Sequence, residues 1–587
     1  MESHRKGNME LRRNIITWYT WLGYIFALSI ALPRPFSTWI FAIWGLFTLG
    51  IIIYDFIGGK HSFGGWRRAD LPCLLLLALA LLGLVSAGVA EQPDLVFRKT
   101  FGPRFSLIVL PVFALLLRRA VDTRGMLKYF VAGNALSIAL SVYFVAYKVF
   151  SGEELELYRD FFSNFTEVCT GFIHRTYLGL NILLSYVAVA YLTHGRTLGR
   201  GERCLWVLYL MVSLAFLLMS GSRIVVLCIP MLAVYYLIIG ICGVQGGKQK
   251  LVFLGGIAII VLVGVFFMPT RMSYMLSQEG ACGMLANDPR AEIWPNVWAM
   301  IQERPLLGFG LDNIEAPLVS SYLSHGFLEG VAFRYAPHNE YLSEWAQMGV
   351  GGVLLLVAIL LSLPLSAGRT DRKLIWPISI VFAIVFLSES MLDRYMGCLT
   401  FAFFVSLMGR GRSDDGERNI GGRYIKILIP VLLLIPVLFL LSALRTSCFA
   451  PQKLINVPNN DDGKDIFEMR EGNFASFLHG GQCVKRLPIA YCDLREGEST
   501  SFSISCRCGA EFDGSSIRII AERDMADGTH IPTQCAYDLN RKGEWQELGL
   551  ELSGRQTILI YLTGGPEIHS NGFRGSIFFK KPYFISN

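Results

Sequence analysis

The stretch APHNEYLSEWAQMGVGG, residues 336–352, is followed at once by VLLLVAILLSLPL, residues 353–365. The first part carries a histidine, an asparagine and two glutamates, whereas the second is apolar enough to lie in lipid. Ionisable groups at membrane depth are energetically costly and usually serve a function. The junction therefore predicts a membrane helix with a polar site at one end.

Apolar runs of this kind recur along the first three quarters of the chain. Of its 587 residues 53% are hydrophobic and only 17% charged, and the mean hydropathy is +0.45. A bilayer core is crossed by about 17–25 apolar residues. We count thirteen candidate spans, near 15–32, 36–55, 71–90, 105–117, 126–150, 176–193, 204–220, 224–241, 251–268, 346–366, 374–392, 395–409 and 424–444. The first lacks a small-residue cleavage site after it, so we interpret it as a retained span.

The orientation of these spans follows from Lys and Arg in the connectors. With the N-terminus in the cytoplasm, the inner connectors hold 24 Lys and Arg, against about eight in the short outer ones. This asymmetry predicts a multi-pass protein of the bacterial inner membrane, with loop 269–345 and the chain after Leu444 in the periplasm. The net charge of +7 then belongs to the membrane pattern and gives no indication of nucleic acid.

The chain is expected to have two main parts, residues 1–444 as a transmembrane bundle and residues 446–587 as a periplasmic domain. The second part alternates apolar and polar residues in short runs such as STSFSISCRC and QTILIYLTG. Period-two runs between Gly and Asp turns predict an all-β sandwich. Six of the thirteen cysteines fall here, an even number that suggests disulfides, and we expect at least two.

The outer loop contains two predicted helices. In DPRAEIWPNVWAMIQERPLLGFG, a stripe of apolar residues at 293, 297, 300 and 301 indicates a helix that ends near Arg304, before Pro305. LLGFGLDN then forms a glycine turn. A second helix is expected to begin near Pro337 and to continue without a break into the span at 346.

His338 is the candidate general base of this second helix. It would share one face with Tyr341, Leu342 and Trp345. The positive end of a helix disfavours an imidazolium, and a neutral histidine can accept a proton. The alternative is a structural role for His338 at a helix cap. The charged residues nearby favour the catalytic role over it.

Ionisable side chains, most of them cationic, gather at the predicted outer ends of other spans. Arg223 lies in SGSR and Arg290 in ANDPRAEIW; Arg98, Lys99 and Arg104 lie in one outer connector; His174 and Arg175 begin a span, and Glu389 lies in SESMLDR. Together they predict a basic cleft at the outer membrane face. Arginine suits a diphosphate there because it is always charged and offers a planar fork of donors. No metal site is convincing, and no cofactor is expected.

These motifs resemble a known family. R-AEIW…ERPLLGFGLDN from Arg290, PHNEYLSEWAQMGVGG and SGSR at 220–223 are similar to the signature of the O-antigen ligases, whose superfamily also holds O-antigen polymerases and bacterial O-oligosaccharyltransferases. The resemblance implies a mainly α, GT-C-like polytopic fold of about thirteen transmembrane helices. The C-terminal β-sandwich is an addition to that pattern.

The resemblance also implies inverting, metal-independent glycosyl transfer at the periplasmic face. The donor would be a glycan on undecaprenyl pyrophosphate, and the acceptor lipid A–core or another glycan. His338 would take the acceptor proton, while Arg223 and Arg290 would hold the departing pyrophosphate. Asn339 and Tyr341, within the motif, would bind substrate with the other polar residues named above.

Three alternatives stay open on the sequence. A repeat-unit polymerase and a protein O-oligosaccharyltransferase would use the same donor. A non-catalytic lipid-glycan transporter is less favoured, because it should carry polar residues near span midplanes and broken helices in two matched halves.

Overall fold

The fold is that of a computed structural model. It describes residues 2–57, 68–117, 122–150, 175–194, 196–219, 223–243, 289–325, 327, 330, 334–367, 369–408, 452–455, 466–469, 475–479, 482–493, 499–509, 516–523, 533–553, 555–563, 577–580 and 583–585. The chain divides into two compact units. The helical unit comprises Met1–Asp288, Leu306–Leu311 and His338–Leu440, and the second unit comprises Pro289–Pro305, Asp312–Pro337 and Leu441–Asn587.

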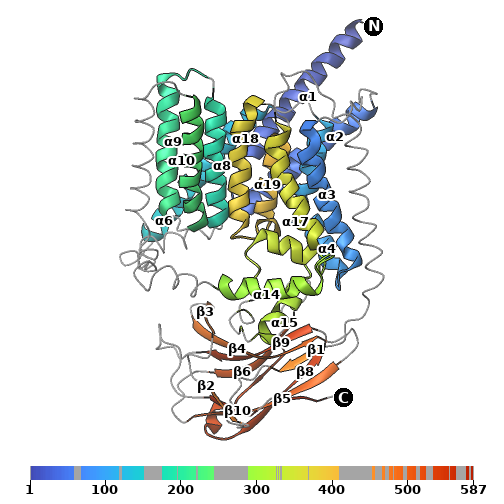
Figure 1. The fold of residues 1–587 in the computed structure, drawn as a ribbon, viewed down its shortest axis with the longest axis vertical. Helices are drawn as coiled ribbons and strands as arrows, with labels where there is room; N and C mark the ends of the chain where they lie inside the picture. The colour runs from blue at the N-terminus through green and yellow to red at the C-terminus, as the bar shows by residue number, and fades with distance from the viewer. Residues whose placement is uncertain are drawn as a thin grey trace. The chain divides into compact units, whose positions relative to one another are not determined.

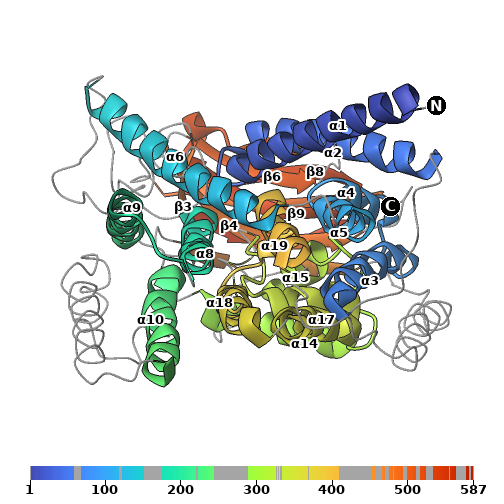
Figure 2. The same cartoon turned by 90° about the horizontal axis from the view of Figure 1, so that it is seen from above.

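The helical unit is a bundle of mostly apolar helices (Figure 1). Those described are α1 (Glu2–Ser29), α2 (Arg34–Ile57), α3 (Leu71–Val85), α4 (Pro93–Phe101), α5 (Ser106–Leu116), α6 (Thr123–Phe150), α8 (Arg175–Thr193), α9 (Arg200–Met219), α10 (Arg223–Gly243), α17 (Glu340–Ser366), α18 (Arg369–Phe386) and α19 (Tyr395–Met408). Figure 2 shows α19 in the middle of this unit, where every residue from Gly397 to Met408 is buried. A helix that is apolar all round belongs in such a central position.

The described residues contain five helices long and apolar enough to cross a membrane. A sixth span results if α4 and α5, which meet at 48°, are one broken span. The predicted number of thirteen is not confirmed, and the runs 251–268 and 424–444 lie outside the described residues. The mainly helical character of this part of the chain is confirmed.

The helix α17 is broken inside its first half. Met348 has φ −123° and ψ 15°, and Gly349 has φ 66° and ψ −167°, so the backbone leaves the helical conformation there. The break frees the carbonyls of Ala346 and Gln347, which accept hydrogen bonds of 2.9 Å each from the N–H groups of Phe309 and Gly310. The two motifs LLGFG and AQMGVGG therefore fit together, backbone to backbone.

Two of our predictions for this helix were wrong. It begins at Glu340 rather than near Pro337, because Asn339 takes an extended conformation and its side chain caps the helix by accepting from the N–H of Leu342 at 3.2 Å. It also does not run unbroken into the apolar span, because glycine at 349 takes a conformation that only glycine adopts readily. The predicted glycine turn is confirmed, with Gly308 at φ 70° and Gly310 at φ 98°.

Gly349→Ala is expected to destabilise the protein. A Cβ atom at this position would lie 2.1 Å from the carbonyl oxygen of Leu306, and the backbone conformation disfavours any side chain by about 1–3 kcal/mol. Gly50→Ala on α2 is the matched control, because a Cβ there meets nothing within 4 Å. Thermal unfolding of the purified variants in detergent checks this, and a Gly349→Ala melting temperature equal to that of Gly50→Ala would contradict it.

The second unit includes two helices from the segment 269–345, α14 (Arg290–Glu303) and α15 (Glu315–Ser324). The predicted end of the first helix is confirmed, since Arg304 is its C-cap, and the four residues of the predicted stripe are all buried. Ser321 on α15 donates to the backbone and side-chain oxygens of Asn296 on α14, at 3.2 and 2.9 Å. The helix α15 was not predicted.

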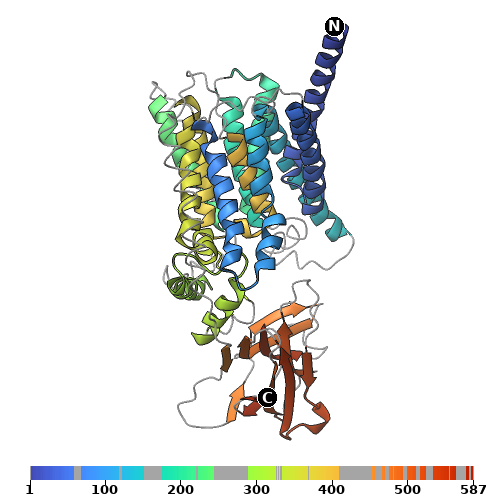
Figure 3. The ribbon, with the colours of Figure 1, turned by 90° about the vertical axis from the view of Figure 1, so that its right-hand side faces the viewer.

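The C-terminal part of this unit consists of two antiparallel sheets (Figure 3). One contains β1 (Gln452–Ile455), β3 (Ala475–His479), β4 (Gln482–Asp493), β6 (Ser516–Arg523), β7 (Thr533–Ala536) and β9 (Arg555–Thr563). The other contains β2 (Ile466–Met469), β5 (Ser499–Cys508), β8 (Gln546–Ser553), β10 (Ile577–Lys580) and β11 (Tyr583–Ile585). Buried residues of both sheets form one apolar core, as the predicted period-two runs require.

The cysteines of the sheets differ from the expectation of disulfides. Cys506, Cys508 and Cys535 are free thiols. Burial raises the pKa of Cys506 to about 12 and that of Cys535 to about 11, which keeps both neutral. These three thiols therefore take no part in the expected disulfides, and the side chains of the other three tail cysteines lie outside the described part of the structure. The first two pack in the core as small apolar side chains, a common place for free cysteine.

Candidate functional site

His338 is held in an unusual backbone conformation directly before α17. Its φ is 46°, in the left-handed region that non-glycine residues seldom adopt. The next residue, Asn339, is the N-cap, so His338 stands outside the helix. Our prediction that His338 shares a helical face with Tyr341 was therefore wrong. Such strained positions persist only where the surrounding structure enforces them, and they cluster at active sites.

A carboxylate from another part of the helical unit faces His338. The distance from His338 Nδ1 to Glu389 Oε1 is 3.6 Å, and Glu389 lies between the end of α18 and the short helix η3 (Met391–Asp393). The side chains are 35% and 17% exposed, respectively. A carboxylate in this position favours the tautomer that carries its proton on Nδ1, which leaves the basic lone pair of a neutral imidazole on Nε2.

Behind this pair lies a cluster of five charged residues, which we call the buried-charge cluster: Lys99, Arg104, Glu340, Glu344 and Asp393. Arg104 donates to both carboxylate oxygens of Glu344, and its Nε donates to the carbonyl of Leu392 at 3.2 Å. The side chains of Arg104 and Glu344 are only 4% and 0% exposed. Ion pairs in which a guanidinium donates two hydrogen bonds to one carboxylate are stronger than hydrogen bonds between neutral groups.

Asp393 joins three elements in this cluster. Its Oδ1 lies 3.6 Å from Lys99 Nζ and 3.7 Å from Arg104 Nη2, and its Oδ2 accepts from Ser343 at 3.1 Å. Gln347 donates to both Asp393 and Ser343. Burial raises the pKa of Asp393, but the two cations and the two hydrogen bonds outweigh it and hold this pKa below its usual range. The carboxylate therefore remains ionised and keeps η3 against α17.

Glu340 completes the attachment of η3. Its Oε2 accepts from the backbone N–H of Leu392 at 2.7 Å, while Oε1 makes no hydrogen bond within the described residues. Two cations thus meet three acidic groups in a nearly dry environment. The cluster fixes the start of α17 and the segment 389–393 relative to each other, and these two segments carry His338 and Glu389.

The other residues predicted for the site have varied positions. Asn339 serves as the helix cap, and the hydroxyl of Tyr341 donates to the carbonyl of Ala383 on α18 at 3.1 Å. Arg98 is exposed beside Asp94, at 3.9 Å. Lys99 and Arg104 point into the buried-charge cluster. For all of these, contact with a substrate stays a prediction.

The predicted arginines begin helices. Arg223 is the first residue of α10 and Arg290 the first of α14; the latter belongs to the second unit. In that unit Trp294, one turn after Arg290, donates through Nε1 to the carbonyl of Pro337 at 3.2 Å. Arg175 is the first residue of α8, and His174 lies outside the described residues. The side chains of Arg175 and Arg223 are likewise not described.

Sequence reasoning did not assign Ser343, Glu344 and Gln347 to the site. A signal was present, because residues 340, 343, 344 and 347 have the i, i+3, i+4, i+7 spacing of one helical face. All four are polar and buried, on a helix that is otherwise largely apolar. The partners Arg104 and Asp393 are far away in the sequence, so the spacing alone does not reveal them.

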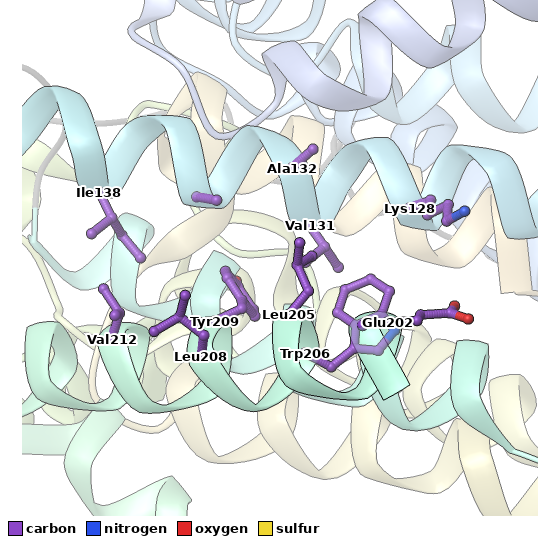
Figure 4. Close-up of a pocket in the computed structure, with 12 residues that line it drawn as sticks. Lys128, Val131, Ala132, Ile138, Glu202, Leu205, Trp206, Leu208, Tyr209 and Val212 are labelled. Carbon is purple, nitrogen blue, oxygen red and sulfur yellow. The ribbon is translucent and has the colours of Figure 1, made fainter. Parts of the chain in front are cut away.

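A separate groove lies between α6 and α9. Its volume is about 680 Å³, and its lining is mostly apolar, with Leu205, Trp206 and Leu208 on one side and Val131 on the other (Figure 4). Lys128 and Glu202 lie at one end. The groove shares no residue with the buried-charge cluster, and its lining suits hydrocarbon rather than chemistry.

The family comparison bears on this arrangement. Residues 208–357 match the family model described as O-antigen ligase. This segment, about a quarter of the chain, carries the signature of the O-antigen ligase superfamily. The matched segment contains Arg223, Arg290 and His338, as well as the loop and helix break that fit together. Among curated proteins, no match is found.

This match to the O-antigen ligase family supports a membrane glycosyltransferase of the ligase or polymerase kind. It implies a lipid-linked glycan and an acceptor as substrates in general. The long apolar helices agree with a membrane protein.

Proposed function

We propose that this protein transfers a glycan from undecaprenyl pyrophosphate to lipid A–core at the periplasmic face of the inner membrane, with inversion at the anomeric carbon. The observation that carries the proposal is the His338–Glu389 pair. It joins a histidine in a strained backbone conformation to a carboxylate at 3.6 Å, beside a rigid buried-charge cluster. A base oriented by a third group is the usual arrangement for activating a hydroxyl nucleophile.

The chemistry is a single displacement. Nε2 of His338 takes the proton from the acceptor hydroxyl as its oxygen attacks the anomeric carbon. The bond from that carbon to the pyrophosphate oxygen breaks on the opposite face, and undecaprenyl pyrophosphate leaves with the bonding electrons. Glu389 stabilises the imidazolium that forms, because an opposite charge nearby favours it.

Arg223 and Arg290 are assigned to the pyrophosphate. Each is the first residue of a helix, where unpaired backbone N–H groups and the helix dipole favour phosphate oxygens. The guanidinium adds two parallel donors and a permanent charge. In this proposal the two arginines balance the charge that grows on the leaving group.

Arg223→Lys and Arg290→Lys are each expected to lower transfer by about 10²–10³-fold, because lysine keeps the charge but loses the bidentate fork. Transfer by the unaltered protein should survive EDTA, since arginine takes the role that a divalent cation has in many glycosyltransferases. A reconstituted assay with lipid-linked glycan and purified acceptor measures both. Activity that is lost in EDTA and restored by Mg²⁺, or lysine variants as active as the parent, would contradict the assignment.

The acceptor is tested in a deletion strain. The proposed ligase predicts lipopolysaccharide that ends at the core, with long polymer accumulated on its lipid carrier. Core with a single repeat unit on a gel would instead indicate a polymerase. Intact lipopolysaccharide with unglycosylated periplasmic proteins would indicate a protein O-oligosaccharyltransferase.

A further inference from the structure

The outward face of the five-stranded sheet carries polar and aromatic side chains in a regular arrangement. Alternate residues of β5, β8 and β10 are buried in the core, among them Ile504, Leu550 and Phe579. The residues between them must therefore point away from the core. They include serines on β5, two glutamates on β8 and an aromatic ring on β10.

Tyr583 lies along this face rather than standing up from it. It belongs to β11, which pairs with β5, and β5 pairs with β8 on its other edge. The Tyr583 hydroxyl donates to Glu547 Oε1 on β8 at 2.8 Å, across two strand spacings of about 4.8 Å each. Only a ring that lies over β5 can reach that far. The small side chain of Ser503 beneath it also donates to Glu547, at 2.7 Å.

The Tyr583–Glu547 pair offers two kinds of contact to a ligand. Tyr583 is 48% exposed, so one face of its ring is open. Hydrogen bonds from Ser503 and Tyr583 hold the pKa of Glu547 below its usual range, so this exposed group is a carboxylate. Both bonds go to Oε1. Within the described residues Oε2 makes no hydrogen bond and is available as an acceptor.

A second aromatic group lies further along β5. The guanidinium of Arg507 stacks over Trp545 and Phe578, with its Cζ atom 5.1 and 4.9 Å from the two ring centroids. Lys580 Nζ also lies 5.1 Å from the Trp545 centroid. Stacking leaves the edge of the guanidinium open, and its N–H groups donate to no acceptor in the described part of the chain. Two rings thus hold the donors of Arg507, which follows Ser505 by two residues on β5, and Ser505 pairs with Glu547 in the sheet.

Gly549 leaves space beside the Tyr583–Glu547 pair. It is exposed, it pairs with Ser503 in the sheet, and a Cβ atom added to it would come no closer than 3.8 Å to any other group. The absence of a side chain there is thus not required by packing. A glycine inside a strand often marks a place where a ligand approaches the backbone.

We propose that this sheet face, centred on Tyr583, Glu547 and Arg507, binds a carbohydrate chain. A sugar ring has an apolar C–H face and a rim of hydroxyls. It matches an open aromatic ring flanked by fixed acceptors and donors. A protein partner would instead favour an apolar centre with charges at the rim. The choice of glycan as ligand rests on the proposed function, in which the substrates are glycans.

The experiment measures binding of the full-length protein in nanodiscs to polysaccharide released by mild acid from the producing strain's own surface. Tyr583→Ala removes the ring, Arg507→Ala removes the donors, and Gly549→Ile fills the open space with a strand-forming side chain. Each is expected to raise Kd at least about tenfold. The matched control is Arg518→Ala, because Arg518 is an exposed arginine on β6 of the other sheet.

The same measurement on His338→Ala separates this proposal from the proposed function. Unchanged binding by that variant, together with loss in the three sheet variants, supports a glycan site on the sheet. If the unaltered protein does not bind the polysaccharide but still transfers glycan, the sheet proposal is overturned and the function stands. It is also overturned if the sheet variants bind the polysaccharide as well as Arg518→Ala does. The same holds if Gly549→Ile still binds the polysaccharide but no longer binds a periplasmic protein that the parent binds. Binding without any transfer activity overturns the function alone.

Discussion

Replacing His338 by alanine is expected to lower the rate of glycan transfer by about 10²–10⁴-fold, the usual contribution of a positioned general base. The protein should still accumulate in the membrane, because His338 lies outside α17 and is a third exposed. Transfer of labelled glycan by equal amounts of purified parent and variant measures the effect. A histidine with a structural role would instead change the amount of folded protein.

The backbone at His338 calls for a second variant. Its φ of 46° disfavours alanine, so His338→Ala could act through the backbone as well as through the lost imidazole. Asparagine tolerates the left-handed region but cannot take up a proton as imidazole does. His338→Asn should therefore be as inactive as His338→Ala and as stable as the parent. His194→Ala, at an exposed histidine after α8, is the matched control and should be fully active.

Glu389 gives an independent test of the same pair. Glu389→Gln keeps the shape but removes the charge that stabilises the imidazolium formed as the acceptor proton moves to His338, so the rate of transfer should fall. The fall should be smaller than in His338→Asn, because the imidazole itself is still present. If Glu389→Gln lowers transfer further in a protein that already carries His338→Asn, Glu389 acts on another group.

Local features of the fold could be predicted from the sequence where one strong signal decides them. The end of α14 before Pro305 and the glycine turn at 308–310 are such cases, because proline cannot continue a helix and glycine accepts positive φ. The break at Gly349 was missed, because a glycine within an apolar run looks the same whether it is helical or not. The start of α17 was missed because the cap formed by Asn339 outweighed the preference of proline for a first turn.

The site was predictable only in part for a different reason. His338 and Glu389 were both singled out as functional, but their pairing depends on how η3 packs against α17. Arg104 and Glu344 are 240 residues apart, and nothing in a single sequence connects them. We had assigned Arg104 to an open basic cleft, whereas its side chain is buried against carboxylates. A long-range ion pair of this kind becomes visible only in three dimensions.

Breaking that ion pair is expected to destabilise the protein strongly. Arg104→Met leaves Glu344 as a buried charge without its main partner, and Glu344→Met does the same to Arg104, so each should lower the free energy of unfolding by about 3–5 kcal/mol. The double variant Arg104→Met/Glu344→Met removes both charges and should recover most of that loss, because a buried pair is often replaceable by apolar side chains of similar volume.

Arg98→Met is the matched control; its partner Asp94 is 3.9 Å away and both side chains are more than half exposed, so its effect should stay below about 1 kcal/mol. Titration of the purified variants with SDS, followed by circular dichroism, measures all four. If Arg104→Met and Glu344→Met are each as stable as Arg98→Met, water must reach the Arg104–Glu344 pair. If the double variant is stable but transfers glycan poorly, the buried-charge cluster positions His338 and Glu389 for the reaction in addition to stabilising the fold.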